Sequence, residues 1–304
     1  MSKQLKGTLM LLLAALIWGS TFVAQDVGMD LIGPFTFQAI RQIMGFFVLL
    51  PVILLRSKAN KDPSKSQDRK KERRILLGYG ALCGLILFFA CNLQQFGLIY
   101  TTAGKSGFIT ALYIVLVPIA GTFFGKKGGI GVWMAVLFSV VGLYFLCING
   151  DSFSLGKGEL LTLLCALCFT VHILVIDHVS PKADGVALSA LQFLFSGLIS
   201  LVFMIFTETV IWKDVLACWL PICYAGLLSC GVAYTLQIVA QRDTNPTVAS
   251  ITMSTESVFA VLSGWIVLNQ RLSLRELLGC ILMFAGVILA QLPNKKIKKQ
   301  KAIA

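Results

Sequence analysis

Charged residues are scarce in this sequence. Asp, Glu, Lys and Arg make up 13% of its 304 residues and 57% are hydrophobic, whereas about 25% of the residues of an ordinary soluble domain are charged. This composition excludes a typical soluble globular protein. The sequence also lacks a Walker loop, a cluster of metal ligands and a nucleophile motif, so we expect no cofactor, no metal site and no enzymatic activity.

Long apolar runs occupy most of the chain instead. A bilayer core about 30 Å thick needs about 20 apolar residues per helix, and ten stretches meet this requirement. They are residues 7–25, 34–55, 75–100, 103–124, 128–148, 158–176, 186–206, 215–239, 246–268 and 274–292. The sequence therefore predicts an all-α, multi-pass protein of the plasma membrane with ten transmembrane helices.

The second half of the chain repeats the first. Residues 6–26 align without gaps with residues 157–177, and both segments begin with Lys-Gly and end with Asp. Five apolar stretches separate the two starts, so the copies enter the membrane from opposite sides. Inverted repeats are typical of secondary transporters, whose halves rock around a site near the midplane. We expect five-helix repeats over residues 1–148 and 149–292, followed by a basic cytoplasmic tail over residues 293–304.

The basic residues favour one orientation in the membrane. Lys and Arg collect in cytoplasmic loops, and with the N-terminus inside, the basic loop 56–74 and the tail 293–304 are both cytoplasmic. The outer segments then hold only Lys105, Lys157, Lys213, Arg271 and Arg275. We therefore expect both termini in the cytoplasm. No aromatic residue is interleaved with the charges of the 56–74 loop, so a nucleic-acid partner is not expected.

Several segments of the two halves carry a family resemblance. Residues 93–118 read LQQFGLIYTTAGKSGFITALYIVLVP, and Ala240-Gln241-Arg242 and residues 256–260 (ESVFA) follow later. In this order the segments resemble the two repeats of EamA-type transporters of the drug/metabolite transporter superfamily. The resemblance covers residues 7–292 and implies a transporter of small organic solutes, a monomer or a homodimer in the lipid bilayer.

The sequence departs from this family's pattern at two places. The family often has Gly-Glu after the fourth and ninth helices, where this chain has Lys126-Lys127 and Asn269-Gln270. Any role of that carboxylate is absent here. Ser257 stands where the family commonly has a proline, which would remove the local kink.

Five residues are candidates for binding a solute in a central cavity. At about 1.5 Å per residue, Trp18, Tyr113 and Glu256 each lie about 15 Å from the end of their stretches, close to the bilayer midplane. Arg41 lies about 10 Å from the outer end of the second stretch. His172 lies toward the inner side of the sixth stretch.

Glu256 and Arg41 are the charged members of this set. Glu256 is the only carboxylate deep inside an apolar stretch, and burying it ionised costs about 2.5 kcal/mol or more. It is the first candidate for proton coupling, and its alternative role is that of a protonated or hydrogen-bonded structural residue. Arg41 could bind a carboxylate of the solute, pair with an acid of the protein, or reach the outer interface as an anchor.

A second group of polar residues suggests two gates. Asn92 and Gln95 lie near the outer end of the third stretch, and Tyr234 and Gln237 follow at a constant offset near the inner end of the eighth. The alternative is hydrogen bonding between helices, worth about 0.6 to 2 kcal/mol each. The gate and cavity candidates are Gln38, Asn92, Gln95, Gln192, Tyr234 and Gln237.

These features together favour a secondary transporter that works by alternating access. One Arg, one Glu, amides and aromatic rings suit a zwitterion such as an amino acid or a related metabolite, with export favoured and protons as the coupling ion. The alternatives are a transporter of another metabolite or drug class without proton coupling, and an integral membrane protein that does not transport.

Overall fold

The computed structural model describes residues 3–59, 66–101, 103–123, 129–147, 156–268 and 273–291, which are helical nearly throughout and contain no β-strand. Part of the basic loop (residues 60–65), Lys126-Lys127, Asn269-Gln270 and the basic tail 293–304 lie outside the described residues. The predictions made for those segments are therefore not addressed by the fold.

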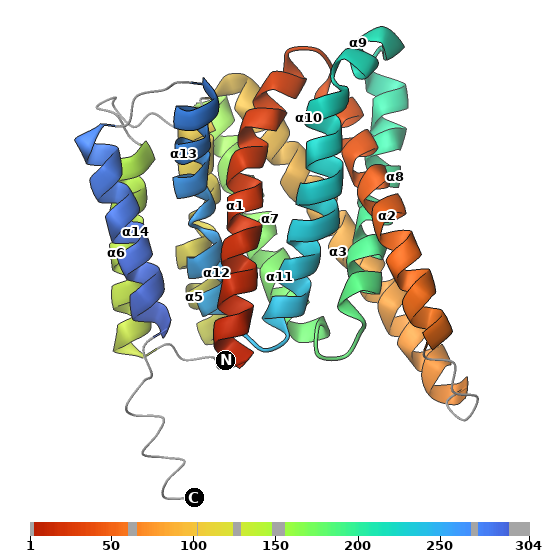
Figure 1. Ribbon diagram of the computed structural model, residues 1–304, viewed down its shortest axis with the longest axis horizontal. Helices are drawn as coiled ribbons and strands as arrows, with labels where there is room; N and C mark the ends of the chain where they lie inside the picture. The colour runs from red at the N-terminus through yellow and green to blue at the C-terminus, as the bar shows by residue number, and fades with distance from the viewer. Residues whose placement is uncertain are drawn as a thin grey trace, which may run out of the picture.

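The helices form one bundle, in which most axes run along a common direction (Figure 1). The first half contains α1 (Lys3–Met29), α2 (Pro34–Ala59), α3 (Ser66–Tyr100), α4 (Ala103–Thr110), α5 (Tyr113–Phe123) and α6 (Ile130–Cys147). The second half contains α7 (Lys157–Val179), α8 (Gly185–Thr207), α9 (Trp212–Ala217), α10 (Trp219–Cys223), the π-helix η2 (Tyr224–Ala233), α11 (Tyr234–Gln241), α12 (Pro246–Met253), α13 (Glu256–Leu268) and α14 (Leu274–Gln291).

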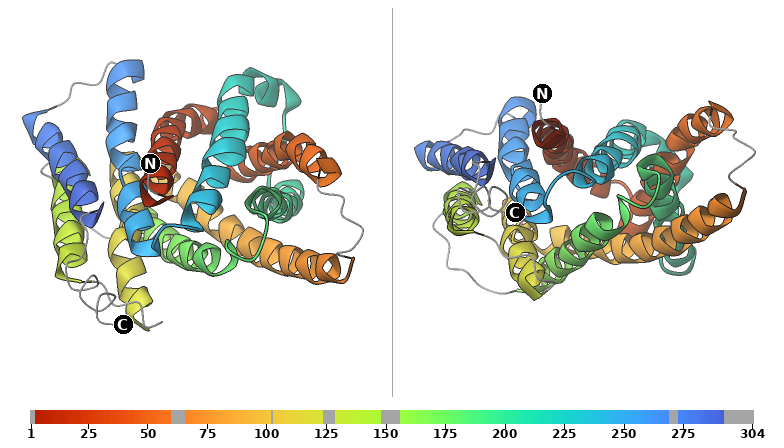
Figure 2. Two further views of the ribbon diagram at one scale, coloured as in Figure 1. Left: turned by 60° about the horizontal axis from the view of Figure 1, so that its bottom comes forward. Right: turned by 90° about the horizontal axis from the view of Figure 1, so that it is seen from below.

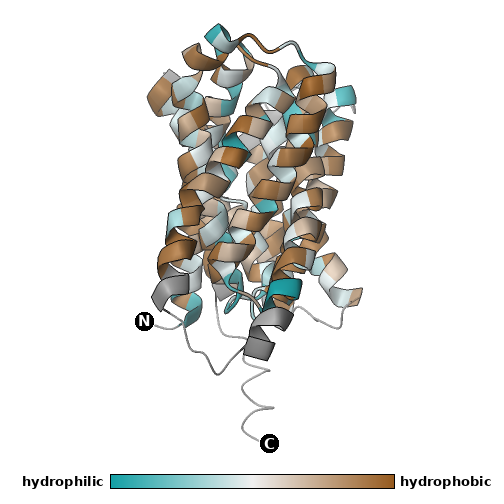
Figure 3. Ribbon diagram, turned by 90° about the vertical axis from the view of Figure 1, so that its right-hand side faces the viewer, coloured by the Kyte–Doolittle hydropathy of each residue, from teal (hydrophilic) through white to brown (hydrophobic). Residues whose placement is uncertain are grey.

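Seven helical segments of the described chain are long and apolar enough to cross a bilayer. They are Lys3–Met29, Pro34–Leu55, Glu72–Tyr100, Lys157–Val179, Gly185–Thr207, Trp219–Gln241 and Pro246–Val267. The other three predicted stretches fall on α4 with α5, on α6 and on α14, which are shorter as described. Hydrophobic residues extend along the helices (Figure 3), and large apolar side chains such as Phe47, Phe123 and Phe206 are exposed. In lipid, helices satisfy their own backbone hydrogen bonds, which the surrounding hydrocarbon cannot do. These long apolar helices therefore make the protein an all-helical, multi-pass membrane protein.

The helix contacts are nearly unchanged when the first half of the chain is exchanged for the second. α6 packs along α14, and α2 packs along α8. Each of these pairs contains one helix from each half in corresponding positions, so exchanging the halves gives the same pair. α3 packs on α7, and the exchanged pair is α1 on η2 and α11. In the same way α7 packs on α4 and α5, as α1 packs on α12 and α13. Figure 2 shows α6 and α14 side by side at one edge of the bundle.

Small residues allow these close contacts, since packing rather than water exclusion holds helices together in lipid. A Cβ atom on Gly7 would clash with Thr244 and lie 3.4 Å from the Ala240 carbonyl oxygen. A Cβ atom on Gly158 would lie 2.9 Å from the Thr101 Cβ and 3.0 Å from the Gly97 carbonyl oxygen. Gly158 follows Gly7 by 151 positions, and Thr244 follows Thr101 by 143. The same contact is therefore made twice, at constant offsets.

We predict that adding a methyl group at Gly142 or Gly286 destabilises the α6–α14 pair. A Cβ atom on Gly142 would lie 2.8 Å from the Gly279 carbonyl oxygen, and one on Gly286 would lie 2.9 Å from the Ala135 carbonyl oxygen. Backbone atoms cannot move aside cheaply, so Gly142→Ala and Gly286→Ala should each cost about 1–3 kcal/mol. Thermal unfolding in detergent measures this cost.

Gly131 is the matched control, because a Cβ atom there would meet nothing within 4 Å although the residue lies on the same helix, α6. Gly131→Ala should be neutral or stabilising by up to about 1 kcal/mol, since Ala is the better helix former. Equal shifts of the unfolding temperature in all three variants would contradict the close packing.

The N-terminus of α2 is held by the residue that follows α8. Pro34 begins α2, where its missing N–H costs nothing. The carboxylate of Glu208, which follows the last residue of α8, accepts hydrogen bonds from the backbone N–H groups of Phe35 and Thr36 at 2.8 Å each. A carboxylate is favourable at a helix N-terminus, so this contact ties α8 to the start of α2.

Two of the predicted stretches are broken in the middle. α4 ends at Thr110 and α5 begins at Tyr113, while α12 ends at Met253 and α13 begins at Glu256. The second break follows hydroxyl groups that bond backbone carbonyls within the helix, a competition that bends helices: Ser250, Thr252, Ser254 and Thr255 all make such bonds. The helix is therefore interrupted between α12 and α13 even though Ser257 stands where the family commonly has a proline. The prediction that this replacement removes the local kink is wrong.

The π-helix η2 shifts the correspondence between the two halves by one residue. At its start, Gly226 packs against α2 as Gly84 of α3 packs against α8, at an offset of 142 positions. After it, Gly97 and Ala240 correspond at an offset of 143. A π-helix accommodates one extra residue in a helix. The counterpart of Gln237 is consequently Gln94 rather than Gln95.

Candidate functional site

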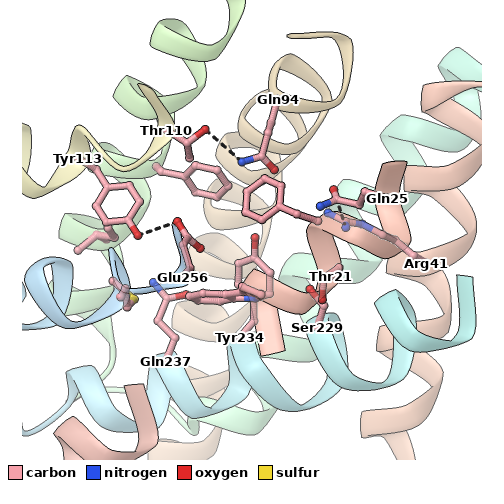
Figure 4. Close-up of a pocket in the computed structure, with 15 residues that line it drawn as sticks. Thr21, Gln25, Arg41, Gln94, Thr110, Tyr113, Ser229, Tyr234, Gln237 and Glu256 are labelled. Carbon is pink, nitrogen blue, oxygen red and sulfur yellow. Dashed lines mark hydrogen bonds between the residues drawn. The ribbon is translucent and has the colours of Figure 1, made fainter. Parts of the chain in front are cut away.

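A cavity lies among the helices of the bundle (Figure 4). Both broken helices contribute to its wall, together with α1, α2, α3, α7, η2 and α11. Ten of its lining residues form five pairs that correspond between the halves at the offsets of 151 and 143 positions. The pairs are Trp18 with Phe169, Phe22 with Ile173, Gln94 with Gln237, Thr110 with Met253 and Tyr113 with Glu256.

One wall is formed by the starts of the two half-helices α5 and α13. Tyr113 begins α5 and Glu256 begins α13, and the Tyr113 hydroxyl donates a 2.9 Å hydrogen bond to the Glu256 carboxylate. Both side chains are buried. A helix N-terminus favours negative charge, so the start of α13 is a suitable place for a carboxylate in an apolar surrounding.

Tyr234, another residue of the wall, makes a second contact between corresponding residues. The Tyr234 hydroxyl lies 3.7 Å from the Cys91 Sγ, and these positions are 143 apart. The indole of Trp18 packs edge-on against the Tyr234 ring, with ring centres 4.8 Å apart. Corresponding residues can touch each other only close to the axis that relates them. The cavity between the Tyr113–Glu256 and Tyr234–Cys91 contacts therefore lies on the approximate two-fold axis of the molecule.

Arg41 lies at another end of the cavity, away from Glu256 (Figure 4). The residue is 3% exposed, and its guanidinium donates from Nε to the Gln38 amide oxygen at 2.9 Å and from Nη1 to the Gln25 amide oxygen at 3.1 Å. Gln38 in turn donates to Gln95 at 3.0 Å. These acceptors are neutral, and no carboxylate in the described part of the chain forms an ion pair with Arg41. A buried cation whose hydrogen-bond acceptors are neutral is suited to binding an anionic group.

Six of the eleven residues singled out in the sequence line this cavity: Trp18, Arg41, Tyr113, Tyr234, Gln237 and Glu256. The other five lie outside it. Gln38 accepts a hydrogen bond from Arg41, and Gln95 accepts one from Gln38. His172 and Gln192 bond each other at 3.0 Å, and Asn92 donates to the Phe88 carbonyl oxygen and to Ser200 between α3 and α8.

Sequence reasoning missed several polar residues of the wall, notably Thr21, Gln25 and Gln94. The signal for the first two is helical spacing, because Trp18, Thr21, Phe22 and Gln25 follow the i, i+3, i+4, i+7 pattern of one helix face. Gln94 donates to the Thr110 hydroxyl at 3.3 Å. The one-residue shift at η2 concealed it, since an uninterrupted repeat points to its neighbour Gln95.

Two polar atoms of the wall have no hydrogen-bond partner in the described structure. They are the indole N–H of Trp18 and the amide oxygen of Gln237. A buried polar group without a partner costs about 1–3 kcal/mol. A donor and an acceptor of this kind in a cavity wall are suited to bonding a polar solute.

A helical bundle with a polar cavity between two broken helices, near an approximate two-fold axis, is the architecture of helical membrane transporters. The chain belongs to the EamA-like transporter family, whose signature covers residues 5–148 and 156–292. The resemblance noted in the sequence is thereby confirmed.

Known relatives agree with this assignment. An uncharacterized transporter of Archaeoglobus fulgidus is 33% identical over 297 residues, which cover 95% of this chain and 87% of the relative. The uncharacterized transporter YoaV of Bacillus subtilis is 23% identical, over 90% of this chain and 92% of the relative. A WAT1-related chloroplastic protein of Arabidopsis thaliana is 24% identical, over 91% and 67%. A solved crystal structure of a protein superposes with a TM-score of 0.77 at 18% identity, over 96% of this chain and 98% of that one, and supports the fold alone.

Proposed function

We propose that this protein is a secondary transporter of the plasma membrane that moves a small organic solute by alternating access, with the central cavity as its binding site. In this proposal ten transmembrane helices form two inverted repeats, residues 1–148 and 149–292. Support comes from the exchange of helix contacts between the halves, from the residue pairs that line the cavity, and from the two ranges of the family signature.

The observation that carries the choice of solute is the separation of charge within one cavity. Arg41 and Glu256 line it from different ends (Figure 4), and aromatic and amide side chains lie between them. A solute with a carboxylate and an ammonium group can engage both residues at once, which a lipophilic cation or a phosphorylated metabolite cannot do. We therefore propose an amino acid or a related zwitterion as the solute.

Glu256 is also the proposed site of proton coupling. An ionised carboxylate in this position costs about 2.5–3.5 kcal/mol. The helix N-terminus stabilises the ionised carboxylate by about 0.3–2 kcal/mol, and the hydrogen bond from Tyr113 stabilises it by about 1.5–3 kcal/mol. Because these contributions are close in size, an arriving proton or ammonium group decides the state of the carboxylate. Competition between the two is what exchange of a proton for a solute with an ammonium group requires.

Reconstituted protein tests the proposal directly. Purified full-length protein in liposomes should accelerate uptake and efflux of at least one labelled amino acid over protein-free liposomes, and an imposed pH gradient should drive accumulation. Transport that ignores the pH gradient would favour the uncoupled alternative. No transport of any zwitterion, with transport of another solute class, would remove the proposed substrate. The direction of net movement follows from the same assay, and export remains a prediction from the sequence.

We predict opposite sidedness for the two ends of the bundle. The loop 30–33, which lies at the top of Figure 1, should face outward, and residues 180–184 should face the cytoplasm. A cysteine replacing Leu31 should react in intact cells with an impermeant thiol reagent, whereas one replacing Lys182 should react only in inverted vesicles. Both positions are exposed in the fold. Labelling of the Lys182 variant from outside would therefore show that the orientation is the reverse of the predicted one.

A further inference from the structure

The cavity is not symmetric, although most of its wall is paired. Five lining residues have no counterpart in the wall: Thr21, Gln25, Arg41, Ser229 and Tyr234. The first three lie in the parts of α1 and α2 that flank the loop 30–33. Their counterparts, 151 positions later, are His172, Ile176 and Gln192, which flank residues 180–184 on α7 and α8 and are fully buried outside the cavity. The cavity therefore extends toward the loop 30–33 only.

The side of the bundle near residues 180–184 is closed by direct packing. α7 packs against α11 and α12, and the Gln241 amide on α11 donates a 3.1 Å hydrogen bond to the Ile173 carbonyl oxygen on α7. An apolar cluster fills the same region. It comprises Leu11, Tyr113, Val117, Ile173, Ala240, Ala249 and Met253.

The corresponding contacts are missing on the other side. In the described residues, α1 makes at most isolated contacts with α3 and α4, which are the exchanged pairs of α7 with α11 and α12. Leu98 occupies the position that corresponds to Gln241 and cannot donate a hydrogen bond. Several members of the apolar cluster correspond to polar or small residues, namely Thr162, Gly97, Ser106 and Thr110. The bundle is thus closed by packing near residues 180–184, whereas the cavity extends toward the loop 30–33.

From this asymmetry we infer that His172 and Gln192 line the solute cavity in the oppositely facing state, in the places that Thr21 and Arg41 occupy now. The inference rests on the proposed alternating access, in which the second repeat takes up the packing of the first and the first that of the second. His172 then has the position of Thr21, Gln192 that of Arg41, and Ile176 that of Gln25.

Two atoms of the present structure support this assignment independently. The Nδ1 atom of His172 and the side-chain amide nitrogen of Gln192 are buried and have no hydrogen-bond partner in the described structure. Within the described part of the chain, their remaining polar atoms bond only each other, His172 Nε2 with Gln192 Oε1. Buried polar groups without partners need an explanation, and a solute that reaches them in the other state supplies one.

The exchange has a consequence for recognition of the solute. The Arg41–Gln25 subsite is cationic, whereas the corresponding Gln192–Ile176 position is neutral and half apolar. The anionic group of the solute therefore meets a guanidinium in the state that extends toward the loop 30–33, and an imidazole and an amide in the other state. Affinity for a carboxylate is higher on the side of the loop 30–33.

Accessibility of substituted cysteines tests the inference. Thr21→Cys and His172→Cys form a matched pair, Gln192→Cys is a second probe of the hidden position, and the native chain shows the reactivity of its own cysteines. The probe is a membrane-impermeant cationic thiosulfonate, applied to full-length protein in right-side-out and in inverted vesicles. Ser200→Cys, buried between α3 and α8, is the unreactive control.

Thr21→Cys should react from the side of the loop 30–33, and His172→Cys and Gln192→Cys from the side of residues 180–184. Each rate should exceed that of the native chain by about tenfold or more, since minor states populated to about 0.1–10% still permit modification. The inference is overturned if both hidden positions stay unreactive from either side while Thr21→Cys reacts. If one of the two hidden-position variants does not fold in detergent, the other decides the outcome. Failure of the proposed function is recognised separately, because the native chain would then transport no solute in liposomes.

Discussion

Transport by Glu256→Gln should no longer respond to an imposed pH gradient, and its rate should fall by about tenfold or more. Glutamine keeps the size of the side chain and can still accept the hydrogen bond from Tyr113, but it carries neither the titratable proton nor the charge. Loss of one charge-assisted contact with a solute ammonium is worth about 1.5–3 kcal/mol, which corresponds to the expected change in rate. Uptake into proteoliposomes, with and without the gradient, measures both effects.

Glu276→Gln is the control for this experiment. Glu276 lies in the first turn of α14 and accepts hydrogen bonds from Ser273, away from the cavity. Its replacement should leave the response to the gradient intact. If Glu256→Gln still transports and still follows the pH gradient, Glu256 is a structural partner of Tyr113, and the proton must bind elsewhere.

Arg41→Lys should weaken transport of a carboxylated solute by about tenfold to a hundredfold, and transport of its amide analogue much less. A guanidinium binds a carboxylate through two parallel hydrogen bonds that an ammonium cannot reproduce. Each hydrogen bond to a charged group contributes about 1.5–3 kcal/mol, which sets the expected range. Competition by the unlabelled acid and by its amide, measured side by side, separates the two solutes.

The matched control is Arg275→Lys. Arg275 stacks on the rings of Tyr144 and Phe145 between α14 and α6, far from the lining of the cavity. If Arg41→Lys reduces transport of acid and amide equally and unfolds at lower temperature in detergent, the guanidinium serves to hold Gln25 and Gln38. The proposal of a zwitterionic solute would then have lost its main support.

Counting residues along the helices identified part of the cavity wall. Trp18, Tyr113 and Glu256 were expected near the midplane from residue counting alone, and all three line the cavity. Depth along a helix depends only on the rise per residue, about 1.5 Å. The rotation of a helix around its axis is much more sensitive, because one inserted residue turns every later side chain by about 100°. The extra residue of η2 therefore shifts the alignment of the two halves, so that the repeat points to Gln95 where the wall contains Gln94.

The partners of Arg41 show the same limit. Arg41 was recognised because a cation in an apolar run is unusual, which is a local property. Gln25 lies at the end of another helix and carries no charge, and its contact with Arg41 arises from the crossing of α1 and α2. Likewise the Tyr113–Glu256 bond joins residues 143 positions apart, and only the meeting of two broken helices near the two-fold axis brings them together.

The sequence by itself determined the class of this protein. Apolar runs of bilayer length exclude a soluble fold, and the internal repeat with its motifs leads to the EamA-like family. Both are properties of residues close together in the chain or of one segment compared with another. The tertiary structure alone decided which side chains form the cavity, that its two ends differ, and that His172 and Gln192 lie outside it. Those features depend on how many helices are rotated and packed against one another. The packing of small residues and the π-helix η2 set this arrangement, and hydropathy does not encode it.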